Sequence, residues 1–338
     1  MKILLLQLKR IGDLILTAPA LQAVRRCHPE AHLTLCVMEA AAGLAPACAM
    51  VDEVLVLHRK GNNLPFWSKL ALRQYDICLD FTGNDRSAFI SLLSKAHRRI
   101  TFAKVSKSYF RPLFYNEFVQ SSVRERHTID RQLDLVKPLG VTPPPQGEEP
   151  EEPDFGLVIP PRHQESARQL IANEGITDGL YAIVHPGTAR TEKYWCPQKW
   201  ATVIDHCQTQ RGLPCIITGS PDPYENEHIA AIGKALRSPF RNLAGKMDLP
   251  TLAALIRHAS LLVSMDSAPV HLGAVFGTRQ VSLFGQTNPY HWRPRHPRAA
   301  TLLAGHENAL AEFSPHFERR PLSDLSTQAV IGAISNLF

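Results

Sequence analysis

Short apolar runs alternate along this chain with longer amphipathic segments, and this alternation restricts the fold more than any other feature. Continuous apolar runs bounded by turns and separated by helices are typical of a parallel sheet covered on both faces. The predicted strands are Ile3–Leu8, His32–Val37, Val54–Leu57, Asp76–Asp80, Arg99–Phe102, Tyr181–His185, Pro214–Thr218, Ser260–Ser264 and Gln280–Phe284. The predicted helices are Asp13–Cys27, Asn84–Lys95, Glu125–Leu139, Gln198–Gln210, Tyr224–Leu236, Leu249–His258, Pro269–Phe276 and Asp324–Leu337. The sequence therefore predicts a doubly wound α/β fold.

One segment interrupts the alternation. Val141–Pro153 contains five prolines and four glutamates, so it cannot pack a core, and proline keeps it extended. The 338 residues suffice for two domains of about 150 residues each. We predict an N-terminal domain over 1–153 that ends in the linker 141–153, a second domain over 154–323, and a C-terminal helix over 324–338 that packs back on the first domain. A cleft between two such domains is the expected ligand site.

Composition and cysteine use restrict the class of protein. Apolar residues make up 44% of the chain and charged residues 20%, a normal balance for a soluble globular protein. No run approaches the roughly 18 apolar residues of a membrane helix, and the run before Gln7 is too short for a signal peptide. Seven cysteines without a CxxC pair indicate reduced thiols. We expect a cytoplasmic protein whose contact with a membrane is peripheral.

The excess positive charge lies entirely in the first half of the chain. Residues 1–150 hold 20 Lys and Arg against 14 Asp and Glu, whereas residues 151–338 hold 17 of each. Between Arg86 and Arg126, nine basic residues stand against Glu117 and Glu125. A local basic surface predicts an acidic partner: a nucleic acid, an anionic lipid or a phosphorylated substrate.

Asp13 follows the first predicted strand in the segment KRIGD. Gly12 allows a tight turn there, and Asp13 opens the next helix. Two interpretations remain open. The carboxylate either caps the helix by accepting from its N–H groups, or faces the crevice at the carboxyl end of the strand, where sheets of this type bind ligands. The turn lacks GxGxxG, which argues against a dinucleotide-dependent dehydrogenase.

Two later loops contain the groups of a phosphate site. His185–Trp195 runs from a strand through Pro-Gly and hydroxyl residues to Lys193, which offers a phosphate N–H groups, hydroxyls and a cation. Asp266–His271 lies at a helix start, where free N–H groups attract anions. An ordinary loop with a solvated lysine, and a capped helix with a core histidine, are the alternative interpretations.

Two further loops are less specific. Glu225 and Glu227 follow the strand that ends at Thr218, and one of them could bind a ribose, although acidic residues favour the first turn of any helix. Ser282–Trp292 is either a binding loop or a rigid turn. No DxD triplet and no His/carboxylate cluster with metal spacing occurs, so a metal ion is not expected.

Taken in order, these segments resemble glycosyltransferase family 9, the bacterial ADP-heptose:lipopolysaccharide heptosyltransferases of GT-B fold. The resemblance runs from Lys2–Pro19 through His185–Trp200 and Gly219–Glu227 to Leu261–Trp292. The most specific piece is VSMDSAPVHLGAVFGTRQVSLFGQTNPYHWRP, and together with HPGTARTEKYW it is most similar to the heptosyltransferase III branch. The resemblance implies two Rossmann-like domains facing across a cleft. It also implies transfer of heptose from ADP-heptose to the inner-core heptose region of lipopolysaccharide.

The resemblance implies roles for individual residues. Asp13 matches the family's proposed general base. The implied donor-binding residues are Thr188, Thr191, Lys193, Glu225, Asp266, Ser267, Ala268 and His271. Pro223 and Tyr224 depart from the usual acidic run before the nucleoside carboxylate. Pro269 removes a backbone donor where other branches often have a bulkier residue, so phosphate contacts there can differ.

An inverting, metal-independent transfer needs a base for the acceptor hydroxyl and partners for the negative charge that develops on the departing diphosphate. Lys193, His271 and helix N–H groups are the expected partners, no cofactor is expected, and domain closure would exclude water. The implied acceptor is a phosphorylated glycolipid at the cytoplasmic face of the inner membrane, with Tyr109 and Phe110 near the lipid. The residues expected to meet its phosphates are Arg98, Arg99, Lys104, Lys107 and Arg111.

Three alternatives remain at this point. The enzyme could use another nucleotide sugar, since the motifs address diphosphate and ribose better than the transferred sugar. The protein could bind a nucleotide sugar or glycolipid without catalysis. A nucleic-acid binder would use the basic region, but the sequence lacks an RNP motif, a zinc finger or a recognition helix, so no nucleic-acid partner is expected.

Overall fold

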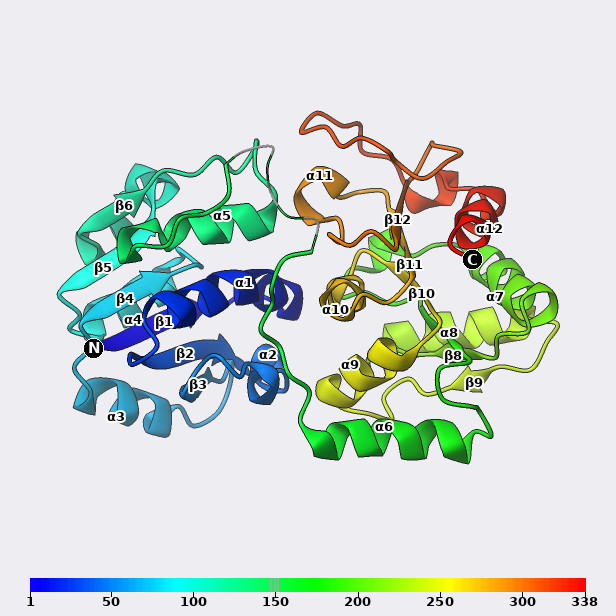
Figure 1. Ribbon diagram of the computed structural model, residues 1–338, viewed down its shortest axis with the longest axis horizontal. Coiled ribbons are helices and arrows are strands. Elements are labelled where there is room, and N and C mark those ends of the chain that lie inside the picture. Colours follow the sequence, from blue (N-terminus) through cyan, green and yellow to red (C-terminus); the bar gives the residue numbers. More distant parts are fainter. Residues whose placement is uncertain (146–147, 149, 151) are drawn as a thin grey trace. The chain divides into compact units, whose positions relative to one another are not determined.

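The computed structural model describes residues 1–145, 148, 150 and 152–338. The chain divides into two compact units, Met1–Val158 and Ile159–Phe338 (Figure 1). Four residues of the predicted linker 141–153, at positions 146, 147, 149 and 151, lie outside the described part. The boundary along the chain follows Val158 and not residue 153, because the segment 154–158 packs on the first unit. Asp154 pairs with Arg26, and Leu157 forms a β-bridge with Cys48.

The first unit is built on an all-parallel sheet in the order β3-β2-β1-β4-β5-β6. Its strands are β1 (Lys2–Gln7), β2 (His32–Met38), β3 (Glu53–Leu57), β4 (Ile77–Asp80), β5 (Arg98–Phe102) and β6 (Glu117–Val119). Its helices are α1 (Ile11–Cys27), α2 (Glu39–Ala42), α3 (Leu64–Leu72), α4 (Asp85–Leu93) and α5 (Thr128–Leu135). Short 3₁₀ turns are η1 (Ala45–Ala47), η2 (Ala103–Lys107), η3 (Arg111–Phe114) and η4 (Lys137–Leu139).

Both faces of this sheet are covered, which explains why its central strand β1 is apolar from Ile3 to Leu6. Leu4 and Leu6 point to one face and join a core with Phe66 of α3 and Ile90 of α4. The intervening side chains of β1 point to the opposite face, because side chains alternate along a strand. There α1 packs against β1, and α5 packs against α1 and β5. The central strand β1 is completely buried from Ile3 to Leu6.

The second unit repeats the architecture with the order β12-β11-β10-β7-β8-β9, again all parallel. Its strands are β7 (Ala182–His185), β8 (Cys215–Ile217), β9 (Arg241–Asn242), β10 (Leu261–Met265), β11 (Gln280–Phe284) and β12 (Ala299–Leu303). Its helices are α6 (Pro161–Asn173), α7 (Pro197–Gln210), α8 (Pro223–Ala235), α9 (Leu249–His258), α10 (Ala268–Phe276), α11 (Pro289–Trp292) and α12 (Thr327–Asn336), with the 3₁₀ turns η5 (Thr191–Lys193) and η6 (Leu322–Asp324).

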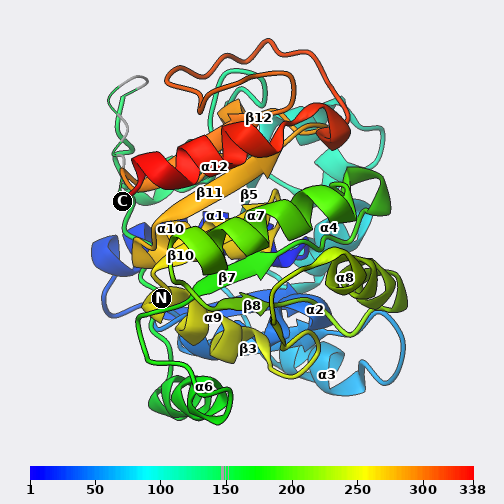
Figure 2. The ribbon, with the colours of Figure 1, turned by 90° about the vertical axis from the view of Figure 1, so that its right-hand side faces the viewer.

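The C-terminal helix α12 belongs to the second unit. Ala329, Val330 and Ile334 are buried in the same core as the strands and α7, and Figure 2 shows α12 beside α7 and β11. The helix contributes to the core of the second unit, and its packing on the N-terminal domain stays a prediction. Its apolar face packs against β11 and β12 and covers that side of the second sheet.

The core of the second unit contains two fully buried tryptophans. Trp195 and Trp200 meet edge to face with ring centroids 5.2 Å apart. The Trp195 indole N–H donates to the Leu325 carbonyl at 3.2 Å, which ties the loop after β7 to the start of α12. This loop carries Lys193, so the aromatic pair also fixes the position of a candidate site residue.

Replacing Trp200 with alanine removes the larger part of this contact. We expect Trp200→Ala to lower the free energy of unfolding by about 3–5 kcal/mol, the usual cost of deleting a buried aromatic side chain. Urea denaturation followed by circular dichroism measures the change. Leu180→Ala, at a side chain that is 58% exposed, is the control and should change stability by less than about 0.5 kcal/mol. Equal midpoints for the two variants would contradict the assignment of the core.

Candidate functional site

In each sheet the strand order reverses between two neighbouring strands, β1 and β4 in the first unit and β7 and β10 in the second. The connections leave such a switch point in opposite directions, so the edge at the carboxyl ends of the two strands is where doubly wound sheets bind ligands. Asp13 follows β1, and Lys193 and Asp266 follow β7 and β10. The main candidate residues therefore gather at the two switch points.

Asp13 lies in the first turn of α1. The N-cap of this helix is Arg10, because the helix begins at Ile11, so the interpretation of Asp13 as the N-cap is wrong. The backbone N–H of Arg10 instead favours the charged form of this carboxyl group and so acts to lower its pKa. Burial raises the pKa of the Asp13 carboxyl, and the charges of Lys9 and Arg131 oppose that rise. A half-buried carboxylate held beside two cations is suited to accept a proton.

Asp80, which the sequence did not single out, ends β4 and is completely buried. Its carboxylate accepts from the N–H groups of Thr82 and Gly83 at 2.7 and 3.0 Å, and from the Tyr115 hydroxyl. Burial raises the pKa of Asp80, and these donors act in the opposite direction. Because Asp80 is opposite Leu6 in the sheet, it lies at the same edge as the loop that carries Asp13.

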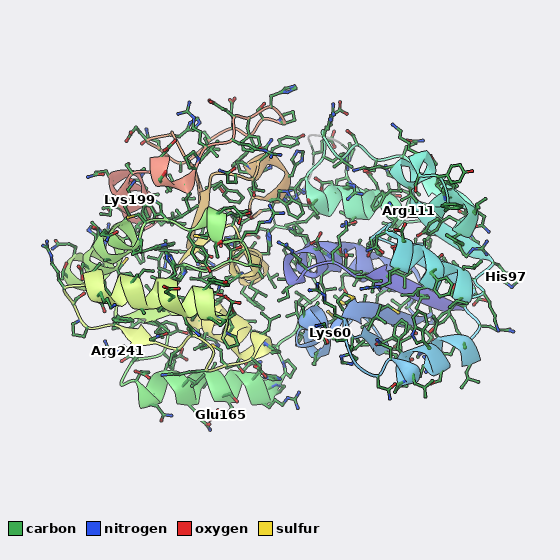
Figure 3. All side chains as sticks on the ribbon, turned by 180° about the vertical axis from the view of Figure 1, so that it is seen from behind. Lys60, His97, Arg111, Glu165, Lys199 and Arg241 are labelled. Carbon is green, nitrogen blue, oxygen red and sulfur yellow. The ribbon has the colours of Figure 1, made fainter. Side chains whose placement is uncertain are left out.

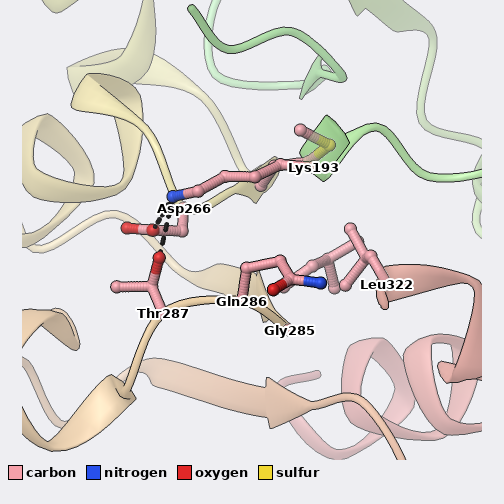
Figure 4. A pocket seen from close by; sticks show the side chains of 8 residues that line it. Lys193, Asp266, Gly285, Gln286, Thr287 and Leu322 are labelled. Atoms are coloured by element: carbon pink, nitrogen blue, oxygen red, sulfur yellow. Dashed lines mark hydrogen bonds and ion pairs between the residues drawn. The ribbon is translucent and has the colours of Figure 1, made fainter. Parts of the chain in front are cut away.

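Lys193 and Asp266 meet at the second switch point (Figure 4). The Lys193 ammonium donates to Asp266 Oδ2 at 2.7 Å and to the Thr287 hydroxyl at 2.8 Å. These residues line a small pocket together with Gly285, Gln286 and other side chains after β10 and β11. The structure thus brings together two predicted residues 73 positions apart, and the lysine is held in one orientation by two oxygen atoms.

Glu225 is buried against two glycines. The Ser220 hydroxyl donates to one carboxylate oxygen, while the other, Oε1, lies 3.8 Å from His185 Nε2 and has no hydrogen-bond partner. A Cβ built on Gly187 would lie 1.6 Å from Oε1, and one on Gly219 would lie 2.9 Å away. Burial raises the pKa of Glu225 and lowers that of His185 to about 4. The pair is therefore a carboxyl group beside a neutral imidazole.

The other predicted donor residues have different surroundings. Thr188 is half-buried in the loop after β7, and Thr191 is exposed at the start of η5. Ser267 is the N-cap of α10 but donates to the Met265 carbonyl and makes no capping bond, and Ala268 begins the helix. His271 is only 4% exposed, and burial lowers its pKa to about 4. A neutral imidazole still has one N–H donor, so the predicted contact of His271 with the donor phosphate stays a prediction.

The predicted acceptor residues divide by type. The three arginines are used by the fold: Arg98 forms a bidentate pair with Glu117, and Arg99 donates to the carbonyls of Phe114 and Ala96. Arg111, labelled in Figure 3, bonds Asp85 and the Gly83 carbonyl. Lys104 and Lys107 are exposed on η2. The lysines therefore remain the better candidates for contacts with an anionic ligand.

The residues that sequence reasoning missed are mainly partners of those it found. Thr287 lies within the segment Ser282–Trp292, so its signal was present but not resolved to one residue. Asp80 is the last residue of a predicted strand, at the sheet edge where ligands bind. This position could have indicated a site residue. Arg131 comes from α5, with its guanidinium 3.9 Å from the centre of the Phe102 ring, and nothing local in the sequence indicates this approach.

Among residues 1–145, 148, 150 and 152–338, no group of three or more His, Cys, Asp or Glu side chains has the arrangement of a metal site. In the same part of the chain, no helix combines the length and the apolar character needed to cross a membrane.

Comparison with known proteins decides the family. The family model for glycosyltransferase family 9 (heptosyltransferase) matches residues 64–319. The chain belongs to glycosyltransferase family 9. This confirms the predicted family and the prediction of a glycosyltransferase. The family model begins after Asp13, at residue 64. Two curated relatives nevertheless align over 97% and 98% of this chain.

Curated relatives in this family include the lipopolysaccharide heptosyltransferase 3 of Escherichia coli K12, which is 24% identical over 97% of this chain and 95% of its own length. The lipopolysaccharide core heptosyltransferase OpsX of Haemophilus influenzae is also 24% identical, over 98% of this chain and 96% of its own. The first of these supports the resemblance to the heptosyltransferase III branch.

Solved structures confirm the predicted GT-B fold. A family 9 glycosyltransferase from Veillonella parvula has a TM-score of 0.83 at 23% identity, covering 99% of this chain and 96% of its own. The E. coli heptosyltransferase WaaC with ADP has a TM-score of 0.73 at 21% identity, covering 99% and 97% of the two chains.

The contact between Gly187 and Glu225 can be tested in this family 9 fold. We expect Gly187→Ala to displace the Glu225 carboxyl and to lower the free energy of unfolding by about 1–3 kcal/mol, because the new methyl group overlaps a buried side chain. Urea denaturation measures the effect. Gly332→Ala in α12 is the matched control: its Cβ would meet nothing within 4 Å, so stability should rise by about 0.5–1 kcal/mol. A Gly187 variant as stable as wild type would refute the contact.

Proposed function

We propose that this protein is an inverting heptosyltransferase that moves heptose from ADP-heptose to the inner-core heptose region of a lipopolysaccharide precursor. The proposal rests on the family and on one structural observation in particular. A half-buried carboxylate, Asp13, lies at one switch point, and a fixed ammonium group, Lys193, lies at the other. The two units would thus supply a proton acceptor and a partner for a phosphate leaving group.

The leaving group in this proposal is the ADP diphosphate. A nucleoside diphosphate already leaves readily, so the protein has only to stabilise its developing negative charge. Lys193 is oriented for this by Asp266 and Thr287, and the N–H groups at the start of α10 add a partial positive charge. The proposed step uses no metal ion and no cofactor. A solved relative is described as WaaC with ADP-2-deoxy-2-fluoro heptose, which supports this choice of donor.

The nucleoside of the donor is assigned to Glu225. Its Oε1 has no protein donor, so it can accept from a ribose hydroxyl. Gly187 and Gly219 let the carboxyl group lie against their backbone, and a larger side chain at either position would displace it. Lys193 lies in η5 after β7, and Glu225 lies in the first turn of α8 after β8. Because these two strands are adjacent, we propose that one extended ligand meets both residues.

The acceptor hydroxyl is assigned to Asp13. In an inverting transfer this oxygen attacks the anomeric carbon on the face opposite the leaving diphosphate, forms the new glycosidic bond and gives its proton to the Asp13 carboxylate. The bond between the anomeric carbon and the phosphate oxygen breaks, and ADP leaves with that electron pair. Lys104 and Lys107 are exposed in the same unit and are proposed to meet phosphates of the acceptor.

Asp13→Asn tests the assignment of the base. The amide cannot accept the proton as a carboxylate does, so we expect turnover to fall by about 10²–10⁴-fold while ADP binding stays within twofold. ADP release in the presence of donor and acceptor measures turnover, and calorimetry measures ADP binding. Glu30→Gln, at an exposed carboxylate of the same unit, is the control and should keep full turnover. Turnover near the wild-type value in Asp13→Asn would exclude Asp13 as the base.

Donor identity is tested separately with ADP, UDP, GDP and CDP. A ligand that binds only the folded state raises the apparent melting temperature by mass action. We expect ADP to give the largest thermal shift, and Glu225→Gln to reduce that shift. Greater stabilisation by UDP would replace ADP-heptose with another nucleotide sugar while leaving the proposed site in place.

We also propose that the protein works at the cytoplasmic face of the inner membrane as a peripheral protein. Twelve of the fifteen large apolar side chains that stand exposed in the described residues belong to the first unit. Eight of them lie on α3, α4 and the loop from η2 to η3, in a stretch, 59–113, with eleven Lys and Arg against three Asp. Exposed apolar side chains in a stretch with excess positive charge suit a bilayer that contains anionic lipid.

The membrane proposal is tested by sedimentation with vesicles of phosphatidylcholine, with and without 30% phosphatidylglycerol. Binding should need the anionic lipid and weaken as salt is added. Replacing Tyr109 and Phe110, 87% and 64% exposed, with serine should reduce the bound fraction about tenfold or more. Leu180→Ser, at an exposed side chain of the second unit, should not. Equal binding by all three proteins would contradict this surface.

A further inference from the structure

Arg131 is a half-buried arginine of α5 with no role in the proposal above. Its guanidinium group lies over the Phe102 ring, with Cζ 3.9 Å from the ring centre. Its Nε is buried and has no hydrogen-bond partner among the residues that the structure describes. A guanidinium that leaves water normally binds carbonyl or carboxylate oxygens, because an unpaired buried donor is costly. Arg131 therefore keeps hydrogen-bonding capacity that the fold does not use.

The acidic side chain nearest along α5 is bound to other cations. Asp134 lies one turn after Arg131, but its carboxylate pairs with Arg126 at 3.3 Å. The same carboxylate pairs with Lys137 at 2.8 Å. Neighbouring arginines of the basic stretch are ion-paired with acidic side chains as well. Within the described part of the chain, Arg131 forms no ion pair, so its charge is available to a ligand.

The guanidinium of Arg131 lies at the sheet edge that the proposed reaction uses. Phe102 is the last residue of β5 and follows Thr101, which is opposite Asp80 at the end of β4. The helix that carries Arg131, α5, packs against both β5 and α1 (Figure 1). Asp13 lies in the first turn of α1. The ring under the guanidinium therefore marks the carboxyl edge of the first sheet, where Asp13 also lies.

A second cation follows the same strand end. The turn η2 begins at Ala103, directly after Phe102, and Lys104 is exposed in it. A guanidinium restrained by an aromatic ring can give an oxyanion two parallel hydrogen bonds, and a lysine adds a point charge on a flexible stem. This pair of cations suits a phosphate or a carboxylate group.

We propose that Arg131 binds an oxyanion of the acceptor, a phosphate or a carboxylate group. The inference rests on the proposed function, which places the acceptor at the first unit. It adds to that function a guanidinium whose side chain is held by a ring, whereas Lys104 and Lys107 are exposed and less specific in direction.

Two substitutions of Arg131 test this contact. Arg131→Met keeps an apolar stem and removes every donor, so we expect the acceptor KM to rise about tenfold or more, since hydrogen bonds to a charged group are lost. Arg131→Lys keeps the charge but cannot give two parallel bonds, so the rise should be about threefold. The donor KM, and kcat at saturating acceptor, should stay within about twofold, because the lost contact is a binding contact.

Arg124→Met is the matched control. Arg124 is exposed in the same unit, and its removal changes the net charge by the same amount. Its acceptor KM should stay within about twofold of the wild-type value. Circular dichroism verifies that each variant folds, and Arg131→Gln takes the place of Arg131→Met if the latter is poorly folded.

Modified acceptors identify the oxyanion. If the group is a phosphate, treatment of the acceptor with phosphatase should remove the difference in KM between wild type and Arg131→Met. If it is a carboxylate, chemical reduction of the acceptor carboxyl groups to alcohols should do so. The two changes act on one contact, so their effects should not add. A full difference that persists with both modified acceptors overturns the inference.

The remaining outcomes are also decisive. An unchanged acceptor KM in Arg131→Met and Arg131→Gln overturns the inference. An equal rise in Arg124→Met overturns it as well, because net charge would then explain the effect, and a rise confined to the donor KM would place Arg131 on the donor. If wild type transfers no sugar from any nucleotide donor, the proposed function itself fails. Calorimetric binding of the same lipopolysaccharide precursor then decides the inference, which requires a dissociation constant about tenfold higher for Arg131→Met than for wild type.

Discussion

Burial of both faces of a parallel sheet is the constraint on which the rest of this structure depends. Helices cover each sheet on two sides, so the edge at the carboxyl ends of the strands is left for polar chemistry. Both units have the same strand order, counted from their own first strand, and therefore the same switch point. The chemistry differs only through the residues that follow the central strands: a carboxylate after β1 in one unit, and a lysine after β7 in the other.

Partial burial at these edges determines how the charged groups are held. An ammonium group that loses water needs oxygen partners, and Lys193 obtains them from Asp266 and Thr287. A phosphate oxygen that reaches Lys193 competes with Asp266, but it meets an ammonium group that is already oriented. Such preorganisation removes the cost of ordering a flexible lysine when charge develops on a leaving group.

The sequence predicts the central strands and the loops at their ends, because continuous apolar runs and loop motifs are local features. It misses β6, β9 and β12, which lie towards or at sheet edges, since short or half-buried strands lack a continuous apolar run. The candidate site is predicted only in part, because its loop motifs are local features whereas the contacts between the loops are not. Lys193 and Asp266 each belong to a recognisable loop, but their contact spans 73 residues and no local pattern indicates it. Burial of His271 likewise depends on packing around α10, which a motif does not contain.

The basic charge of the first unit shows why composition alone overstates a binding surface. A guanidinium group offers several donors in a fixed plane, so the fold recruits arginines to bind carbonyls and carboxylates. Arg98 ties β5 to the edge strand β6 through Glu117, and Arg99 binds the carbonyls of Ala96 and Phe114. Lysine, a strongly hydrated point charge on a flexible stem, stays in solvent, as Lys104 and Lys107 do. The charge that can meet an anionic partner is therefore carried mainly by the lysines, although arginines contribute equally to the net charge calculated from the sequence.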